Sequence, residues 1–556
     1  MNDFRGLRKS NVILKRYFST TGLLVGTFFF ALSMTPSLLP RTDLFQGLVS
    51  GLSMAAGYGL GVIFIWLYSY FELPKPGRKY QKIAQIIAFI ICLLTVIIFL
   101  WQASSWQNSL RRLMEMEEVT GTQLLLVGFV ALVTFLSVIM ISRVVRWTFR
   151  LITGKLKNYF PTRVSLTIGL IGSFFLFWSI IDGVLFSSIL RTADRTYEQV
   201  DALMEPEAEK PADPMKTGSI ESLLSWEEMG RQGRRYLSSG PSAFDFSNFT
   251  DDFVQDPIRV YVGMHVAETF EERARLALEE LKRVGGFDRE ILVLITPTGT
   301  GWVDPSGIGP LEYLFRGNVA SIAAQYSYLP SPLSLMFRDE YGVEMARALF
   351  QEVYGHWKDL AVEDRPRLYL HGLSLGALNS DRSFDHFDII DDPFHGALWV
   401  GPPFRKTTWQ NVTNRRNPDS PAWLPRFRDG SVVRFANQNG GLRDANAEWG
   451  SFRIAYLQYA SDPVTFFAPG SFTRSPEWLS EPRGPDVSED FRWFPVVTMV
   501  QLAFDMISGT EPTGYGHEYA AEHYFDSWLA LTEPDGWRDE ELDRLRNFFK
   551  EYRSVR

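Results

Sequence analysis

A serine between two glycines is the residue best placed to do chemistry in this 556-residue chain. It is Ser374, in His371-Gly-Leu-Ser-Leu-Gly376, which follows an apolar strand pattern and precedes a helical one. A sharp strand-to-helix turn holds such a serine in strained geometry, and only glycines fit the crowding around it. The pattern predicts a serine nucleophile. The alternative is a glycine-rich turn in which Ser374 caps the helix.

A serine nucleophile needs a base, and the base needs an acid that orients it. On a strand–turn–helix scaffold of this kind, the acid and then the histidine follow the serine in the chain. Asp462 lies in the loop after the predicted strand 453–459, and we favour it as the acid. The alternative for Asp462 is an ordinary Asp-Pro turn residue. Asp444 is the reserve candidate for the acid.

Two histidines follow Asp462 and are therefore candidates for the base. His517 lies in a loop with two glycines, Gly514-Tyr-Gly-His517, whereas His523 falls within a helical run, where a packed or surface histidine is the default. We predict His517 as the base. A zinc site formed by the two is excluded, because residues six apart do not share a helix face.

The negative charge that forms during attack on a carbonyl needs backbone N–H donors. The first is the amide of Leu375, at the start of the predicted helix. The second usually comes from the loop after an earlier strand. Here that loop is Thr296-Pro-Thr-Gly-Thr-Gly-Trp302, and Thr298, Gly299 and Thr300 are its candidate donors. The loop lacks the Lys-Ser/Thr ending of a phosphate loop, which argues against nucleotide binding.

The elements around these residues alternate between strand and helix patterns. Strands are expected at 259–263, 290–295, 367–371, 397–401, 432–435 and 453–459, and helices at 268–284 and 344–358. This order predicts an α/β domain over residues 256–556, with a mostly parallel sheet and helices on both faces. The chemistry of such sheets lies beyond the carboxyl ends of the strands.

The N-terminal part has a different character. Long apolar stretches at about 19–40, 44–71, 83–102, 124–141 and 166–190 predict an all-α domain of five membrane spans over residues 1–190. Buried helices of a soluble domain are the alternative, but those carry a polar face. The segment 191–255 is expected to be a linker, extended and flexible at 205–219 and then helical near 220–236.

The charges predict how the spans are oriented. Residues 1–190 hold 18 Lys+Arg and 7 Asp+Glu, whereas the rest of the chain is acidic. Fifteen basic residues precede span one or lie between spans two and three and spans four and five; the opposite loops hold three. The positive-inside rule places the N-terminus in the cytoplasm of a plasma-membrane protein and the catalytic domain in the periplasm or outside. We interpret the first run as an uncleaved anchor rather than a signal peptide.

Three features of the apolar regions leave alternatives open. Gly47 with Gly51, and Gly57 with Gly61, allow close helix approach, within the bundle or between copies of the chain. Asp182, in the fifth span, is interpreted as hydrogen-bonded in the bundle, and alternatively as a proton or substrate site. The aromatic segment 491–508 is either a core helix or a cover over the site that binds an acyl chain.

The sequence predicts no cofactor and no metal. Cys92 is the single cysteine, and it lies inside an apolar run, so neither a disulfide nor a cysteine metal site can form within the chain. The acidic second part does not favour nucleic acid as a partner. Membrane lipids and an apolar ester or acyl substrate are the partners we expect.

These motifs together resemble the α/β-hydrolase superfamily. More closely, the chain resembles a bacterial membrane-anchored family with an N-terminal multi-span domain and a C-terminal catalytic domain. The resemblance rests on His371-Gly-Leu-Ser-Leu-Gly376, Thr298-Gly-Thr-Gly-Trp302, Gly401-Pro-Pro403 and Gly516-His517. It implies Ser374 as nucleophile, Asp462 as acid and His517 as base, and it implies no particular substrate. The loop at 298–302 departs from the superfamily in lacking the usual His-Gly start.

Two classes of function follow from the sequence. The first is a serine hydrolase of the esterase or lipase kind, cleaving an apolar or lipid ester; an acyltransferase that uses the same acyl-enzyme is a close variant. The second is a non-catalytic envelope or transport-accessory protein on an inert hydrolase fold. The presence of candidates for all three catalytic roles, in the expected order, favours the enzyme.

Overall fold

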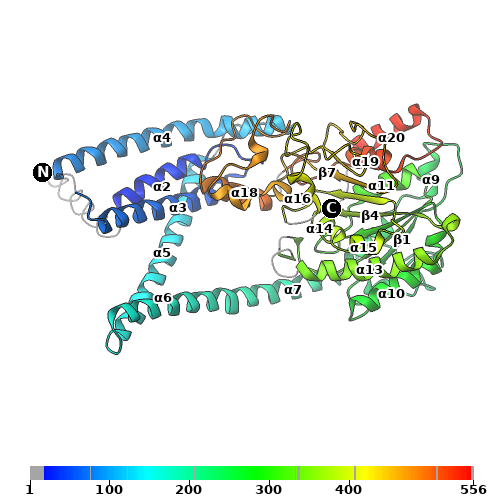
Figure 1. The fold of residues 1–556 in the computed structure, drawn as a ribbon, viewed down its shortest axis with the longest axis horizontal. Helices are drawn as coiled ribbons and strands as arrows, with labels where there is room; N and C mark the ends of the chain where they lie inside the picture. The colour runs from blue at the N-terminus through cyan, green and yellow to red at the C-terminus, as the bar shows by residue number, and fades with distance from the viewer. Residues whose placement is uncertain are drawn as a thin grey trace. The chain divides into compact units, whose positions relative to one another are not determined.

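The computed structural model describes residues 18–552, apart from 75–76, 122, 206–207, 332, 335–338, 406–407 and 509–510. The chain forms two compact units (Figure 1). The helical unit contains residues 1–189, 467–479 and 486–512. The α/β unit contains residues 190–466, 480–485 and 513–556. The aromatic segment 491–508 therefore belongs to the helical unit.

The α/β unit is built on a seven-stranded sheet in the order β1-β3-β2-β4-β5-β7-β6. Every pairing between these strands is parallel. The prediction of a mostly parallel sheet is confirmed. The strands are β1 (Ile258–Val262), β2 (Ile291–Thr296), β3 (Val319–Ala324), β4 (Arg367–Leu373), β5 (Gly396–Val400), β6 (Val433–Ala436) and β7 (Arg453–Leu457).

Helices cover both faces of this sheet. Figure 1 shows α10 (Phe270–Arg283) and α13 (Asp339–Asp359) on one face, and α11 (Pro305–Leu314) and α19 (Ala521–Thr532) on the other. Because both faces are covered, the strands are continuous apolar runs such as Ile-Leu-Val-Leu-Ile in β2. The remaining helices are α8 (Gly230–Ser238), α9 (Ala243–Ser247), α14 (Leu375–Asp381), α15 (His386–Ile389), α16 (Thr408–Asn414), α17 (Pro463–Phe466) and α20 (Asp539–Glu551).

The central strands end in register. Thr296 of β2 is level with Gly372 of β4, and Val400 of β5 is level with both Leu373 of β4 and Leu457 of β7. Parallel strands present their carboxyl ends at one edge of a sheet. The loops after β2, β4, β5 and β7, which carry most of the residues singled out in the sequence, therefore meet at that edge.

The helical unit contains α2 (Thr20–Leu32), α3 (Asp43–Tyr70), α4 (Arg78–Leu113), α5 (Leu124–Leu156), α6 (Thr162–Trp178), the π-helical segment η1 (Ser179–Phe186) and α18 (Val497–Ser508). The helix α7 (Ser187–Asp201) continues from η1 into the α/β unit. Among the described residues, three helices rather than five are long and apolar enough to cross a membrane, namely α3, α4 and α5. The number of spans expected from hydropathy was too high by this measure.

The first and fifth apolar runs are divided by local backbone features. The first stays apolar to residue 39, but α2 ends at Leu32 and has 13 residues, since Pro36 and Pro40 follow and disfavour helix before them. In the fifth, regular α-helix ends at Trp178 and gives way to the turns of η1. Hydropathy measures composition and does not register where a helix stops. Asp182 lies in η1 with an exposed side chain.

The glycine pairs of α3 pack within the helical unit. A Cβ on Gly47 would lie 2.6 Å from Val130 of α5, and a Cβ on Gly51 would lie equally close to Thr134. On the α2 side, a Cβ on Gly57 would lie 2.7 Å from Phe29, and one on Gly61 would lie 2.8 Å from the Cα of Gly22. The predicted use of these glycines for close packing in the bundle is confirmed.

The segment 191–255 was expected to be a linker, and this expectation is wrong for most of its length. From residue 190 it belongs to the α/β unit, and Trp226 is 2% exposed. Glu280 of α10 accepts hydrogen bonds from the Ser222 hydroxyl and the Leu223 amide, at 2.7 and 3.0 Å. The composition of 205–219 indicated a flexible tether, but apolar residues just after it anchor the segment to the unit.

Candidate active site

Ser374 occupies the sharp turn between β4 and α14. Its backbone has φ +57° and ψ −124°, a conformation that costs a non-glycine residue about 1–3 kcal/mol. A Cβ on Gly372 would overlap Gly376, and one on Gly376 would overlap the carbonyl oxygen of Thr296. The two glycines are therefore required by packing. The Ser374 amide donates to the Val400 carbonyl at 2.8 Å, which ties the turn to the end of β5.

Asp462 is fully buried at the end of β7 and accepts hydrogen bonds at both carboxylate oxygens. Its Oδ2 accepts from His517 Nδ1 at 2.8 Å, from the Tyr519 hydroxyl at 2.7 Å and from the Thr465 hydroxyl at 3.0 Å. Its Oδ1 accepts from the Val464 amide at 2.8 Å, in the first turn of α17. A carboxylate held at both oxygens has a fixed orientation, and its hydrogen bonds offset the cost of burying it.

His517 is hydrogen-bonded to Asp462 through its Nδ1 atom. With Nδ1–H donating to the carboxylate, Nε2 is the ring nitrogen left to accept a proton. The loop that carries His517 is held by the Gly516 amide, which donates to Ser461 Oγ at 2.9 Å, and by the Gly514 amide, which donates to the Glu518 carbonyl at 2.7 Å. The His517 side chain is 21% exposed, although its Nε2 atom is itself buried.

Gly401 shows how close the serine turn lies to the acid–histidine pair. It follows Val400, the acceptor of the Ser374 amide, and it has φ +52°. A Cβ at this position would lie 2.8 Å from His517 Cε1 and 3.1 Å from Asp462 Oδ2. The structure therefore brings Ser374, Asp462 and His517 together at the ends of β4, β5 and β7, although they are far apart in sequence.

The candidate oxyanion donors do not all remain available. Leu375 is the first residue of α14, where backbone N–H groups have no acceptor within the helix. In the loop after β2, the Thr298 amide donates to the Trp302 carbonyl at 3.0 Å, and the Gly299 amide donates to Ser331 Oγ at 3.2 Å. The Thr298 and Gly299 amides are thus committed within the fold, which leaves Thr300 as the candidate from this loop.

The alternative histidines have other partners. His523 Nδ1 is bonded to the Tyr459 hydroxyl, and burial lowers the pKa of His523 to about 4. His371 lies beneath the turn, where its Nδ1 is 2.9 Å from the Leu398 carbonyl and burial lowers its pKa to about 4. Both are held as neutral, packed side chains.

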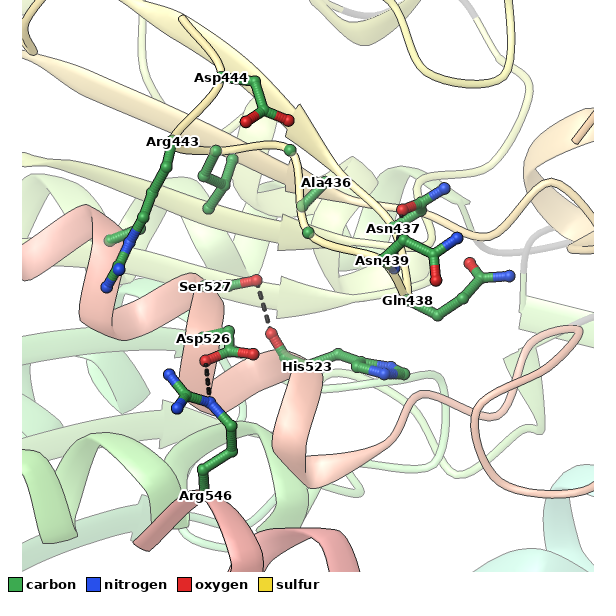
Figure 2. A pocket seen from close by; sticks show the side chains of 14 residues that line it. Ala436, Asn437, Gln438, Asn439, Arg443, Asp444, His523, Asp526, Ser527 and Arg546 are labelled. Atoms are coloured by element: carbon green, nitrogen blue, oxygen red, sulfur yellow. Dashed lines mark hydrogen bonds and ion pairs between the residues drawn. The ribbon is translucent and has the colours of Figure 1, made fainter. Parts of the chain in front are cut away.

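Asp444, the reserve acid, lies away from His517. It is exposed and lines a cavity of about 310 Å³ beside β6, together with His523, Asn437 and Arg546 (Figure 2). Neither Ser374 nor His517 lines this cavity. Arg546 is paired with Asp526 at 3.0 Å inside it.

Two contributors to the site were missed in the sequence. Tyr519 donates to the same Asp462 oxygen as His517, and its ring stacks on Tyr459 with centroids 4.3 Å apart. Burial and the neighbouring carboxylate raise the pKa of Tyr519 well above its usual value, so its hydroxyl stays a donor. Thr465 is the second. In the sequence, only position points to these two residues: Tyr519 comes two residues after His517, and Thr465 comes three residues after Asp462.

Among the residues that the structure describes, no group of three His, Cys, Asp or Glu side chains forms a metal site. The arrangement is a buried carboxylate bonded to a histidine, near a serine in a strained turn, at the carboxyl ends of a parallel sheet. This is the site architecture of α/β-hydrolases.

Comparison with known families agrees with this architecture. The model of an alpha/beta-hydrolase family matches residues 258–545, and the model of that family's N-terminal region matches residues 34–241. The chain belongs to this α/β-hydrolase family. The N-terminal match extends past residue 189 and so includes the first helices of the α/β unit. No curated protein and no solved structure matches the chain.

Proposed function

We propose that this protein is a membrane-anchored serine hydrolase that cleaves an apolar or lipid ester. Ser374 is the nucleophile, His517 the general base and acid, and Asp462 the residue that orients His517. The observation that carries the proposal is the 2.8 Å hydrogen bond from His517 Nδ1 to the buried Asp462, beside a serine held in a strained turn.

The proposed reaction has two halves. Ser374 Oγ attacks the ester carbonyl while its proton passes to His517 Nε2, and the alcohol leaves with that proton as the acyl-enzyme forms. Water then gives a proton to His517 as it attacks the acyl group, and His517 returns that proton to Ser374 Oγ as the carboxylic acid leaves. The Leu375 and Thr300 amides stabilise the oxyanion in both halves. Asp462 stabilises the imidazolium.

The membrane part supports an apolar substrate. Three long apolar helices are compatible with anchoring, and α6 continues into η1 to give 25 helical residues, enough to reach across a bilayer. We propose that the apolar run 19–40, which contains α2, and the continuous helix α6–η1 are also passes, the first and the fifth along the chain. The charge pattern then places the N-terminus in the cytoplasm and the hydrolase outside the plasma membrane. A catalytic unit tied to a bilayer meets lipid esters at high local concentration.

The test is turnover of a panel of esters by the full-length protein in detergent and in vesicles. We expect wild type to hydrolyse medium- to long-chain acyl esters, and Ser374→Ala to lose this activity. The matched control is Ser247→Ala, which removes an exposed hydroxyl in α9 and should keep wild-type rates. Activity that persists in Ser374→Ala, or no turnover of any ester by wild type, contradicts the proposal.

A further inference from the structure

The loop after β2 differs from one amide to the next in what each N–H binds. We call residues 297–302 the oxyanion loop. The Gly301 amide donates to the Thr298 carbonyl at 2.9 Å, and the Thr298 and Gly299 amides have the partners given above. In the described part of the chain, the Thr300 amide makes no hydrogen bond. Because backbone N–H groups in folded proteins are nearly always paired, an N–H left in this way is available to a ligand.

The oxyanion loop begins against the serine turn. Thr296 of β2 is level with Gly372 of β4. A Cβ on Gly376 would overlap the Thr296 carbonyl oxygen and would lie 3.1 Å from that of Pro297. The first turn of α14, which carries the Leu375 amide, is therefore packed against the chain that leads into the loop. The two proposed oxyanion donors thus lie on segments that are in contact.

A tyrosine of β1 holds the far end of the loop. The Tyr261 side chain is fully buried, and its hydroxyl donates to the Gly301 carbonyl at 2.7 Å. Gly301 has φ +86°, and a Cβ there would overlap the Tyr261 hydroxyl oxygen. Glycine is therefore required at this position both by the backbone conformation and by the close approach of the tyrosine.

A buried glutamine directly after β3 holds the neighbouring peptide. Gln325 is 0% exposed, and its Nε2 donates to the Thr300 carbonyl at 3.2 Å. The same nitrogen donates to Asp201 Oδ2 at 3.2 Å and to the Ser327 carbonyl at 3.3 Å. The Oε1 atom accepts from the Met264 amide at 3.4 Å. Because acceptors surround Nε2 and a donor faces Oε1, the side-chain amide is held in one orientation.

These contacts fix the peptide groups on both sides of the Thr300 N–H. In the peptide before it, the Thr298 oxygen and the Gly299 nitrogen are both hydrogen-bonded. In the peptide after it, the Thr300 oxygen and the Gly301 nitrogen are both hydrogen-bonded. The direction of the Thr300 N–H is therefore set before any substrate arrives. A donor oriented in advance stabilises a forming negative charge without having to reorganise during the reaction.

We propose that Gln325 and Tyr261 are positioning residues for the hydrolysis, which act by holding the Thr300 amide where it meets the oxyanion. This role rests on the proposed serine chemistry. Gln325 holds the peptide that directly follows the donor, whereas Tyr261 holds the next one. Loss of the Gln325 contact should therefore have the larger effect.

The experiment compares full-length Gln325→Met and Tyr261→Phe in detergent, because each removes the hydrogen-bonding group and keeps a side chain of similar size. The matched control is Tyr236→Phe. Tyr236 is also buried, lies beside Tyr261 with ring centroids 6.2 Å apart, and has its hydroxyl 2.6 Å from Ser321 Oγ instead of on the loop. Each protein is assayed with para-nitrophenyl octanoate for kcat and KM across pH, and with a trifluoromethyl ketone of the same chain length for Ki. Active sites are counted by fluorophosphonate titration of Ser374.

We expect Gln325→Met to lower kcat about 10- to 100-fold and Tyr261→Phe about 10-fold, with little change in KM, since outright loss of an oxyanion donor costs about 10²- to 10³-fold. The ketone forms an adduct with Ser374 whose oxyanion meets the same donors, so its Ki should rise by the factor by which kcat/KM falls. The pH profile of kcat should keep its shape, because His517 and its partner are unchanged. Tyr236→Phe should match wild type.

Three results would overturn this role. The first is wild-type kcat and Ki in both Gln325→Met and Tyr261→Phe. The second is a fall in kcat with an unchanged Ki, which would place the loss outside oxyanion binding. The third is an equal loss in Tyr236→Phe, which would show a general effect of packing. If Gln325→Met does not fold, Tyr261→Phe, which deletes one oxygen atom, carries the test. Absence of ester turnover and of Ser374 labelling in wild type overturns the serine chemistry itself, which is a separate failure.

Discussion

The sequence predicts the loops at the carboxyl edge of the sheet more accurately than it predicts the helices of the helical unit. In the α/β unit, Ser374 directly follows β4, Asp462 lies in the loop after β7, and His517 lies in the loop before α19, where it is bonded to Asp462. In the helical unit, hydropathy predicted five spans where three helices meet the length and composition of a span. A motif predicts local backbone geometry, whereas an apolar run predicts only that the segment avoids water.

Replacement of the histidine should give the largest effect on the catalytic side of this comparison. His517→Ala removes the only proposed acceptor for the Ser374 proton, and loss of a triad member lowers kcat by about 10⁴-fold or more. The matched control is His523→Gln, in which a packed histidine bonded to Tyr459 is replaced. Steady-state hydrolysis of an active ester checks both; equal losses in the two variants would break the assignment of His517.

The buried and exposed ion pairs of the helical unit should differ strongly in stability. Arg41→Ala leaves Asp505 buried without its partner, which costs about 3–5 kcal/mol. Arg112→Ala breaks a pair whose side chains are 59% and 50% exposed, which costs about 1 kcal/mol or less. Thermal unfolding in detergent measures both. Similar midpoints for the two variants would show that the Arg41–Asp505 pair does not hold the helical unit together.

Acid should destabilise the α/β unit through its buried histidines. Burial lowers the pKa of His371, His395 and His523 from 6.5 to about 4. The unfolded chain therefore binds protons at a pH where the folded chain does not, so stability falls as pH drops from about 6.5 to about 4. For His371 alone the loss is on the order of 3 kcal/mol.

The measurement is hydrogen exchange in β4 and α19 at a series of pH values, corrected for intrinsic exchange rates. Protection should decrease toward pH 4 in wild type and decrease less in His371→Gln. Constant protection over this range in wild type would mean that these histidines are accommodated as charged groups.

The smallest effect should come from Tyr519→Phe. It removes one of three hydrogen bonds to Asp462 Oδ2 while keeping the ring that stacks on Tyr459. A hydrogen bond to a charged group contributes about 1.5–3 kcal/mol, so kcat/KM should fall roughly 10- to 100-fold. Its pH profile should also change, since Asp462 holds His517 less firmly. Wild-type kinetics would show that the remaining hydrogen bonds orient the acid sufficiently.

Much of the α/β unit was predictable from the sequence. The features that were missed are those that local sequence patterns do not show. The expected strands correspond to six of the seven observed, and the missing one is β3, Val-Ala-Ser-Ile-Ala-Ala, whose small residues give a weak strand pattern although all six are buried. The sharp turn at Ser374 was predictable from its neighbouring glycines, and the pairing of Asp462 with His517 from their order in the chain. The Thr298 and Gly299 amides were candidate donors until the structure showed their partners elsewhere in the fold.

The remaining differences between the prediction and the structure concern which elements pack together. Hydrophobic periodicity does not encode this packing. The segment 491–508 was correctly given a helical alternative, but its packing against α3 depends on a pair, Arg41 and Asp505, separated by 464 residues. The expected tether at 205–219 lies beside residues that anchor it to α10. Long-range contacts of this kind are visible only in three dimensions.

The most direct test of the central claim is to map a fluorophosphonate adduct by mass spectrometry and to measure its rate of formation. The account predicts a single modified serine, Ser374, with a labelling rate in His517→Ala reduced by a factor on the order of 10³ or more. An adduct on another residue, or equal labelling of Ser374 in the presence and absence of His517, would contradict it.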